Sequence, residues 1–389
     1  METKSIGEVS QVNLSQIRRT HEGPISYIDT SSVIYGKFSF PKIYSSVQDA
    51  PSRARRLAKS GDTVISTVRP KMCHYGYISS VNEKDIFSTG FVVVHPRRQV
   101  IEPYYLYLVL TSDEVTEKLQ QIAETSTTTY PSIKPSDITS IDIIIPSRKY
   151  QQNVAGIIGA IDEKIVLNQQ INKNLLKLSV LGFNKWLDST QSNQYTSLDK
   201  IASFKNGIAM QKFSPTDKIH VLPVIKIREL NQGYIDSNSD SVTSVIDDDV
   251  KVHNGDLVFS WSGTLSAKIW TDGDAALNQH LFKVTSNRWP KWFYYLWVLH
   301  HLNTFRGIAA DKKTTMGHIK RKDLTNAKVL IPNAKEFKNL DTILNPIIEQ
   351  MVNGGIESKN LIDIRNILLP KLLSGSMDLS SIEETINND

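Results

Sequence analysis

The stretch Ile133-Lys134-Pro135-Ser136-Asp137-Ile138-Thr139, with Ile145-Pro146 after it, decides the fold, because it returns near the other end of the chain. The second copy reads Ile319-Lys320-Arg321-Lys322-Asp323-Leu324-Thr325 and continues to Ile331-Pro332. The offset between the two copies is constant at 186 residues (332 − 146 = 186). A gap-free match over this length is hard to obtain by chance, so the chain contains an internal repeat.

The repeat extends in both directions. Downstream, the same offset carries Lys173-Asn174-Leu175 onto Lys359-Asn360-Leu361. Upstream, with small shifts, Ser60-Gly61-Asp62 is matched by Asn254-Gly255-Asp256, and Tyr104-Tyr105-Leu106 by Tyr294-Tyr295-Leu296. Two repeats of this size are too few and too long for a solenoid. We therefore predict internal pseudo-twofold symmetry, which suits a paired target or paired partners.

The bulk composition permits several functions and excludes few. The 389 residues suffice for two cores, and 45 Lys and Arg against 40 Asp and Glu permit, without requiring, a polyanionic partner. The single cysteine, Cys73, excludes an internal disulfide and favours a reducing compartment. No leader sequence opens the chain and no apolar run reaches about 18 residues, so we expect a cytoplasmic protein without a membrane association.

Each repeat predicts a globular domain of the α+β class. Short β-branched or aromatic runs bounded by Gly and Pro predict strands at residues 63–68, 91–94 and 141–145, and at 221–227 and 257–260 in the second copy. Apolar spacing predicts helices between residues 103 and 121 and over residues 292–305.

Two long amphipathic helices are predicted, one after each domain. Apolar residues recur every three or four positions from 147 to 187, which gives a helix of about 60 Å. A second such stretch follows Pro332, and Pro346, Gly354 and Gly355 predict a kink or local irregularity in it. Burying the two apolar stripes against each other predicts an antiparallel coiled-coil pair with a globular domain at each end. The expected segments are 1–146, 147–188, 189–332, 333–376 and a mobile tail, 377–389.

The sequence predicts no catalytic site. It has no G-x-x-x-x-G-K-S/T phosphate loop, no G-x-G-x-x-G that opens a helix after a strand, and no Asn-Pro-Pro-aromatic motif of DNA amino-methyltransferases. Nuclease-like triplets such as Asp162-Glu163-Lys164 lie in helical segments, where solvated charged faces are expected. The histidines lack partners at metal-ligand spacing. We expect neither enzymatic activity, nor a cofactor, nor a metal.

The first domain contains candidate DNA-binding residues in two clusters. One lies beside a predicted turn and the other follows the strand at 63–68. A guanidinium group can grip guanine O6 and N7 or a phosphate, and His and Tyr can hydrogen-bond or stack. Scattered solvated charge is the alternative interpretation. The candidates are Arg53, Arg55 and Arg56, and Arg69, Lys71, His74 and Tyr75.

The equivalent region of the second domain has different side chains. Asn and Gln can bind adenine N6 and N7, whereas the tryptophan could equally belong to the core. The candidates are Trp261, Ser262, Lys268, Asn278, Gln279 and His280. Matching scaffold positions with differing side chains indicate two homologous domains that recognise different half-sites. Two polar loops suit phosphate contacts that position the duplex, although an ordinary polar turn would have the same composition. The candidates in these loops are Thr128 and Thr129, and Lys312, Lys313, Thr314 and Thr315.

The chain resembles the specificity subunits of type I restriction-modification systems over almost its whole length. The family signature Thr-Gln-Pro-x-Ile, followed by a strand and a Pro-rich turn, is similar to Thr129-Tyr130-Pro131-Ser132-Ile133 and Ile145-Pro146. The second helix ends Leu368-Leu369-Pro370-Lys371-Leu372-Leu373-Ser374-Gly375, which is the more specific match. The second proline and the Glu of the family's turn are absent from both copies.

The resemblance implies a non-catalytic subunit that binds double-stranded DNA. Its target-recognition domains would each read half of a split site in the major groove, and the helices would set the spacer. Two methyltransferase subunits would bind it, and restriction subunits would join them. Two alternatives stay open: a degenerate or orphan scaffold that binds protein partners without sequence-specific recognition, and a self-sufficient DNA enzyme, for which no motif is found. The recognised bases depend on side-chain poses and DNA deformability that no sequence pattern encodes.

Overall fold

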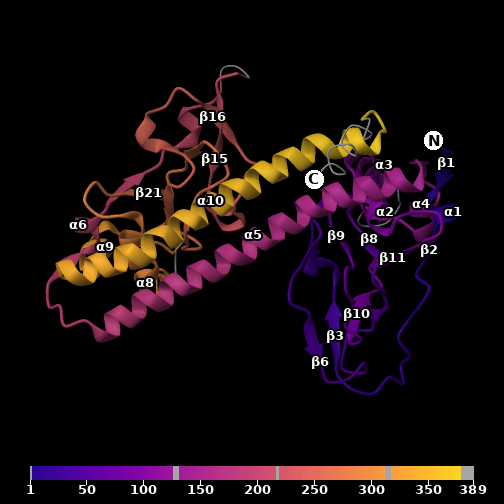
Figure 1. Ribbon diagram of the computed structural model, residues 1–389, viewed down its shortest axis with the longest axis horizontal. Coiled ribbons are helices and arrows are strands. Elements are labelled where there is room, and N and C mark those ends of the chain that lie inside the picture. The colour runs from indigo at the N-terminus through magenta and orange to yellow at the C-terminus, as the bar shows by residue number, and fades with distance from the viewer. Residues whose placement is uncertain (1, 126–130, 216–218, 312–316, 378–389) are drawn as a thin grey trace, which may run out of the picture. The chain divides into compact units, whose positions relative to one another are not determined.

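A computed structural model describes residues 2–125, 131–215, 219–311 and 317–377 (Figure 1). The chain divides into two compact units: the first comprises Met1–Asp162 and Ile364–Asp389, and the second comprises Glu163–Asp363. Each unit therefore holds one globular domain and part of each long helix. The expected phosphate-binding residues Thr128, Thr129 and 312–315, and the expected mobile tail from residue 378 on, lie outside the described residues.

A four-stranded antiparallel sheet in each unit confirms the repeat. The strand order is β2-β11-β8-β9 in the first unit and β14-β21-β18-β19 in the second. The first sheet is built from β2 (Ser10–Val12), β11 (Phe91–Pro96), β8 (Thr63–Ser66) and β9 (Tyr75–Tyr77). The second is built from β14 (Ser203–Asn206), β21 (Leu281–Thr285), β18 (Leu257–Ser260) and β19 (Ala267–Ile269).

A second four-stranded sheet repeats as well, in the orders β6-β3-β10-β7 and β16-β15-β20-β17. Its central pair is parallel in both units, β3 with β10 and β15 with β20. In the first unit the strands are β6 (Lys42–Tyr44), β3 (Ile25–Ile28), β10 (Asp85–Ser88) and β7 (Ala54–Arg56). In the second unit they are β16 (Ser241–Thr243), β15 (Val221–Ile225), β20 (Ala275–Leu277) and β17 (Lys251–Val252).

The stretch that revealed the repeat forms the same short helix twice. It is α4 (Pro135–Thr139) in the first unit and α9 (Arg321–Asn326) in the second. In each, an aspartate in the first turn accepts the backbone N–H of the lysine before the helix, at 2.7 Å from Lys134 and 2.7 Å from Lys320. An acceptor at this place satisfies a backbone donor that the helix leaves unpaired.

The turn that starts β8 and β18 explains the matched Gly-Asp pairs. Gly61 has φ +95° and Gly255 has φ +90°, a region that side chains with a Cβ rarely adopt. The following Asp62 closes the turn by accepting the backbone N–H of Lys59 at 2.5 Å. The same contact recurs in the second unit, so both strands enter their sheets by the same turn.

The helical layer differs between the two copies. The second unit has one long helix, α8 (Lys291–Ala310), but the first has two, α2 (Pro103–Leu110) and α3 (Asp113–Glu124). The prediction of one helix over residues 103–121 is therefore wrong. Ser112 ends that helix because its side chain accepts the N–H of Val115 and caps a new one. Among the described helices, none combines the length and apolar character needed to cross a bilayer.

The two predicted long helices are α5 (Arg148–Ser189) and α10 (Ala334–Leu373) (Figure 1). In the second unit, Asn168 Nδ2 donates to Glu357 Oε2 at 2.7 Å, and Asn172 Nδ2 donates to the Met351 carbonyl at 2.9 Å. From Asn168 to Asn172 the residue numbers increase along α5, while those of the partners decrease along α10 from Glu357 to Met351. The two helices are therefore antiparallel, as predicted. In the first unit, Tyr150 Oη donates to the Leu372 carbonyl at 3.0 Å.

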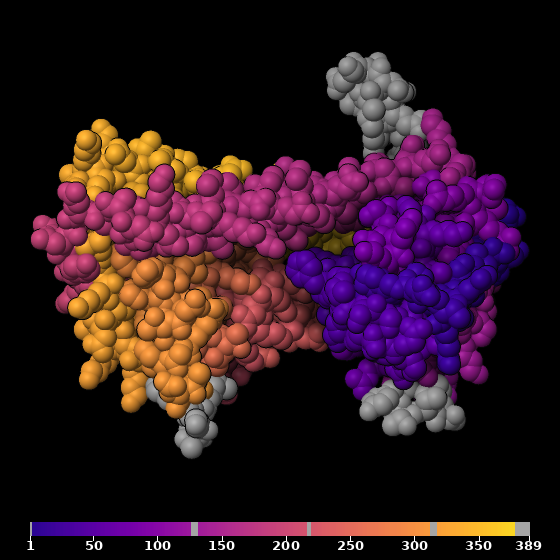
Figure 2. Space-filling view, turned by 90° about the horizontal axis from the view of Figure 1, so that it is seen from below, coloured from indigo at the N-terminus to yellow at the C-terminus, as the bar shows by residue number. Residues whose placement is uncertain are grey.

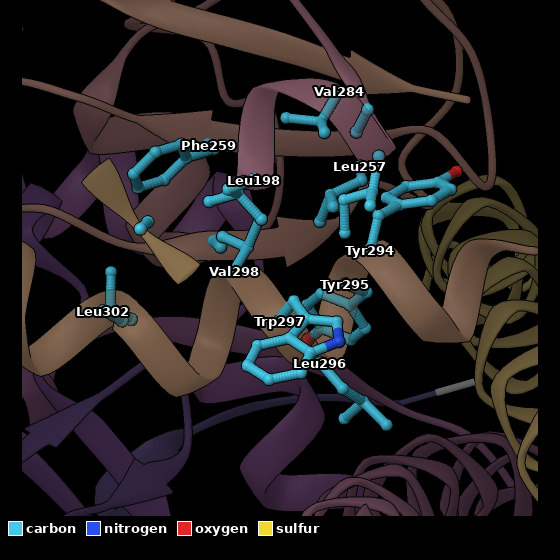
Figure 3. Packing of buried hydrophobic residues seen from close by; sticks show 14 of the residues in the cluster. Leu198, Leu257, Phe259, Val284, Tyr294, Tyr295, Leu296, Trp297, Val298 and Leu302 are labelled. Atoms are coloured by element: carbon cyan, nitrogen blue, oxygen red, sulfur yellow. The ribbon is translucent and has the colours of Figure 1, made fainter. Parts of the chain in front are cut away.

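Each end of the helix pair closes the core of one unit. In the first unit, Val154 and Ile158 of α5 and Leu372 of α10 are buried with the residues of α2. In the second, both helices pack against α8, whose side chains Trp297 and Val298 lie in the core cluster shown in Figure 3. The α5 and α10 residues buried there are Phe183, Trp186, Leu344 and Ile348.

The expected irregularity does not interrupt α10, which is helical through Pro346, Gly354 and Gly355. The glycines serve close packing instead. A Cβ on Gly354 would lie 3.0 Å from Asn172 Oδ1, and one on Gly355 would lie 2.5 Å from Thr271 Oγ1 and 2.8 Å from its Cβ. The helix therefore approaches its neighbours as closely as the backbone allows.

We predict that Gly355→Ala lowers the free energy of unfolding. Forcing a methyl group into close-packed atoms costs ~1–3 kcal/mol, which outweighs the gain of about 1 kcal/mol for alanine over glycine in a helix. Gly182→Ala is the control, because its Cβ would meet only Leu344 Cδ2 at 3.9 Å and should raise stability. Chemical denaturation of both variants tests this, and equal stabilisation by the two would contradict it.

Candidate nucleic-acid interface

In the first unit, the end of β8 is fastened by three backbone hydrogen bonds. Ile133 N donates to the Thr67 carbonyl at 2.9 Å, and Arg69 N donates to the Pro131 carbonyl at 2.9 Å. Thr67 N in turn donates to the Gly90 carbonyl at 2.8 Å. Three segments distant in sequence therefore meet where β8 ends.

The same three hydrogen bonds recur at the end of β18 in the second unit. Ile319 N donates to the Trp261 carbonyl at 3.0 Å, and Gly263 N donates to the Gly317 carbonyl at 2.8 Å. Trp261 N donates to the His280 carbonyl at 3.4 Å. We call these two equivalent arrangements the strand-end frames.

The two strand-end frames have different side chains at equivalent positions. Thr67 in the first frame corresponds to Trp261 in the second, and Arg69 corresponds to Gly263. A common backbone geometry thus presents two different sets of chemical groups. This arrangement suits two homologous surfaces that bind two different targets.

In the first unit, the structure brings together four of the predicted residues on the β8–β9 connection. Arg69 is exposed, and Lys71 Nζ lies 3.0 Å from Glu117 Oε1. His74 Nδ1 donates to the Val33 carbonyl at 2.7 Å. The Tyr75 ring packs within the domain, and its burial raises the pKa of its hydroxyl. Three of these four side chains, those of Lys71, His74 and Tyr75, therefore make contacts within the domain.

The other predicted cluster of the first unit lies on and beside β7. Arg53 is exposed, and its carbonyl accepts the N–H of Thr89, next to the strand-end frame. Arg55 and Arg56 are half-buried. Burial lowers the pKa of Arg56, and its Nε has no hydrogen-bond partner within the described part of the chain. Of the three arginines, Arg53 is the exposed one.

In the second unit, three predicted residues border an open cleft of about 630 Å³. It lies where the parallel strands β15 and β20 end, so loops from both strands form its walls. The lining residues are Met210, Gln211, Lys226, Ile227, Arg228, Asp240, Ser241, Asn278, Gln279 and His280. Sequence reasoning found the last three and missed the others.

Trp261 and Ser262 support this cleft from beneath. The Trp261 ring centroid lies 5.9 Å from that of His280, and Ser262 Oγ lies 3.2 Å from His280 Nδ1. Ser262 is buried and Trp261 is half-buried. Lys268 does not line the cleft, because its ammonium donates to the Asn231 carbonyl and burial lowers its pKa. Trp261 therefore packs against the core and also contacts His280, a residue that lines the cleft.

The missed cations of the cleft belong to an internal charge network. Arg228 contacts Asp236 through Nη1 at 2.8 Å and Glu229 through Nη2 at 2.6 Å, and Glu229 is almost fully buried. The hydrogen bond to Asp236 is the main cause that raises the pKa of Arg228. Lys226 pairs with Asp240. Glu229 lies beside Arg228 in α7 (Ile227–Gln232), whereas Asp236 and Asp240 follow that helix. No spacing in the sequence marks the contacts with these two aspartates.

The strand predicted over residues 221–227 is accordingly too long. It ends at Ile225, because the backbone N–H of Lys226 donates to Glu229 Oε2 at 3.1 Å and starts α7. This early helix start places Lys226 and Arg228 at the cleft.

With its cations paired internally, the cleft presents neutral polar groups. Gln279 is exposed, and its Nε2 lies 3.4 Å from His280 Nε2. Asn278 Oδ1 accepts the backbone N–H of His280 at 3.1 Å, which fixes the orientation of its amide. An amide offers one donor and one acceptor side by side, the pattern that matches adenine N7 and N6.

Comparison with known proteins identifies the family. The family model described as "Type I restriction modification DNA specificity domain" matches residues 1–177 and again residues 192–359. Two matches over most of the chain follow the internal repeat. The chain belongs to this family.

Individual relatives agree with this assignment. The chain is 33% identical over 183 residues to the HindI type I restriction enzyme specificity subunit of Haemophilus influenzae, a match spanning 47% of this chain and 39% of that one. It is 22% identical over 349 residues to the MjaIX specificity subunit of Methanocaldococcus jannaschii, covering 82% and 78% of the two chains. The crystal structure of a type I S subunit from M. genitalium has the same fold, with a TM-score of 0.53, 12% identity and 96% coverage of both chains.

We predict that Arg228→Ala destabilises the chain more than Lys226→Ala does. Removing Arg228 leaves the buried Glu229 carboxylate without its charged partner, which costs about 1–3 kcal/mol. Lys226 and Asp240 are both exposed, so their pair contributes at most about 1 kcal/mol. Urea denaturation of the two variants makes the comparison, and equal losses of stability would show that the network does not organise the cleft wall.

Proposed function

We propose that this chain is the DNA-sequence-specificity subunit of a type I restriction-modification complex. The observation that carries the proposal is the pair of strand-end frames, with one backbone geometry and two sets of side chains. Each target domain reads one half of a bipartite site in double-stranded DNA, and α5 and α10, which both enter the two units, set the spacer. Direct readout of base edges requires side chains that differ between half-sites, and Arg69 on the first frame and Gln279 next to the second differ in this way.

Within this proposal the earlier candidates receive distinct roles. Arg53 and Arg69 contact bases or phosphates of the first half-site, and Gln279 and Asn278 contact bases of the second. The loops containing Thr128 and residues 312–315 supply phosphate contacts, which position the duplex without reading it. Function on DNA places the chain in the cytoplasm of a bacterial or archaeal cell.

Exposed apolar residues on the long helices support two equivalent docking sites for methyltransferase subunits. Leu178 and Leu181 of α5 are 55% and 66% exposed, and Ile364 and Ile367 of α10 are 45% and 60% exposed. Both pairs keep the repeat offset of 186 residues (364 − 178 and 367 − 181). Figure 2 shows α5 lying at the surface. Isolated exposed apolar residues are common, but their duplication at equivalent positions indicates two copies of one partner.

In this assembly the chain has no catalytic activity of its own. The methyltransferase subunits bring the methylation chemistry, and restriction subunits join them to cleave DNA. The chain contributes the choice of sequence and the geometry of the two half-sites.

We predict that single substitutions change one half-site at a time. In the complex with methyltransferase subunits, Arg69→Ala relaxes recognition in the first half-site and Gln279→Ala relaxes it in the second. Loss of one good base contact reduces discrimination by about 1–3 kcal/mol, or roughly 5-fold to 150-fold. Sequencing of methylated sites in cells that carry each variant measures the change.

Lys268→Ala serves as the control, because Lys268 lies outside the cleft and should leave the methylated sequence unchanged. Unaltered methylation in both variants would refute the assignment of Arg69 and Gln279 as readers. A change in both half-sites from one substitution would refute their independence.

We also predict that each apolar pair holds one methyltransferase subunit. Leu178→Asp with Leu181→Asp, or Ile364→Asp with Ile367→Asp, should each remove one subunit, and all four substitutions should remove both. Leu167→Asp is the control, since Leu167 is 49% exposed but its repeat equivalent is Asn353. Native mass spectrometry gives the stoichiometry, and retention of two subunits by the fourfold variant would exclude these docking sites.

A further inference from the structure

The first target domain contains a hairpin that the sequence analysis did not predict. It spans residues 33–38, with β4 (Val33–Ile34) pairing with β5 (Lys37–Phe38), and it follows the parallel strand β3. Its backbone is bonded to the β8–β9 connection: Tyr35 N donates to the Cys73 carbonyl at 2.8 Å, and Gly36 N donates to the Tyr75 carbonyl at 2.9 Å. Hairpin 33–38 and loop 69–73 therefore form one structural unit.

Close packing leaves this hairpin little freedom. A Cβ on Gly76 would lie 2.4 Å from Phe38 Cζ, so the Phe38 ring rests directly on the backbone of β9. A Cβ on Gly36 would lie 2.6 Å from Tyr107 Oη, and Gly36 itself has φ +74°. The hydrogen bond from His74 Nδ1 to the Val33 carbonyl adds a side-chain tie.

Backbone strain is concentrated in the same unit. In the described ranges, four non-glycine residues have positive φ, and three of them lie here: Tyr35 at +48°, Arg69 at +49° and Cys73 at +54°. Such conformations are unfavourable for side chains with a Cβ, persist only where the surroundings enforce them, and cluster at functional sites. The hydrogen bonds and the close packing of hairpin 33–38 hold these residues in their strained conformations.

The strained unit holds an aromatic side chain at its surface. Tyr35 is 57% exposed, its ring packs edge-on against Tyr75 with centroids 6.2 Å apart, and its side chain hydrogen-bonds to that of Cys73. Met72 is 51% exposed, and Lys37 and Arg69, which belong to the same structural unit, are exposed as well. Phosphate contacts need only donors and positive charge, whereas bases also offer methyl groups and π faces to apolar and aromatic side chains.

On the basis of the proposed function, we propose that Tyr35 is a specificity-determining residue that contacts a base of the first half-site. Hairpin 33–38 and loop 69–73 act together as the reading unit of the first domain. His74 and Tyr75, which sequence reasoning offered as readers, act as positioning residues that hold the hairpin. The second domain has α7 after the equivalent strand β15, so its reading unit is built differently.

The test uses the full chain with its methyltransferase subunits and duplex DNA carrying the site that methylation sequencing assigns to the unaltered complex. Tyr35→Asn removes the ring but tolerates positive φ, and Tyr35→Phe keeps the ring. We expect Tyr35→Asn to bind about tenfold to hundredfold more weakly, with lost discrimination at one base pair of the first half-site and an unchanged salt dependence. Tyr35→Phe should keep the discrimination of the unaltered complex.

Tyr195→Asn is the matched control, because Tyr195 is 64% exposed on β13 (Tyr195–Ser197) and away from the cleft-lining residues. Unchanged binding by Tyr35→Asn would overturn the proposal. So would weaker binding to every sequence with a shallower salt dependence, which identifies a phosphate contact. If Tyr35→Asn leaves recognition unchanged while Arg69→Ala and Gln279→Ala each change their own half-site, the role of Tyr35 is overturned and the proposed function stands.

A second measurement does not depend on folding of a variant. 5-Iodouracil or 5-iodocytosine, placed at each pyrimidine of the first half-site, should crosslink to a peptide containing Tyr35 in the unaltered complex. Crosslinks from every position to other peptides alone would overturn the proposal.

Discussion

The burial of both long helices in the core of each unit is the constraint on which the rest of the structure depends. Isolated helices gain little stability in water, and most of their stability in proteins comes from packing an apolar face. Burying one large apolar side chain contributes about 1.5–3 kcal/mol to the free energy of unfolding. The burial of Val154, Ile158 and Leu372 of the long helices therefore contributes substantially to the stability of the first unit. The target domains therefore fold together with the helices, and the helices are ordered because the domains fold on them.

Polar contacts between the helices fix their register within each unit. Apolar stripes alone could slide, because many alignments bury similar areas. In the second unit, the hydrogen bonds from Asn168 to Glu357 and from Asn172 to the Met351 carbonyl are specific to one alignment. A shift of one turn would break both and would drive Gly354 and Gly355 away from the neighbours they approach closely. Register is thus specified at a few positions, as in helix pairs with single buried polar residues.

Features repeated in the sequence could be predicted, and features that depend on contacts made once could not. The repeat led to the pair of equivalent domains and to the antiparallel long helices. The break at Ser112 was missed because apolar periodicity continues across it. The hairpin at residues 33–38 was missed because it is held by Gly76 and Cys73, which lie far along the chain.

Asn278, Gln279 and His280 were predicted from their chemistry, because amide side chains can bind adenine N6 and N7. Arg228 was missed because its contact with Asp236 depends on the loop after α7. Whether the predicted residues contact DNA stays a prediction.

The chemistry of the strand-end frames explains how one fold can present different readers. Its hydrogen bonds join backbone N–H and carbonyl groups, which every residue except proline supplies in the same form. Arg69 and Gly263 occupy equivalent positions, and both have positive φ, +49° and +62°. The frame therefore imposes a left-handed backbone conformation there, which glycine adopts without strain and arginine does not. Glu229 differs, since its buried carboxylate requires Arg228 and Ser239 as partners, and replacing one would leave another unsatisfied. The backbone hydrogen bonds of the frames therefore accommodate different side chains, whereas the residues that support the cleft can be replaced only together.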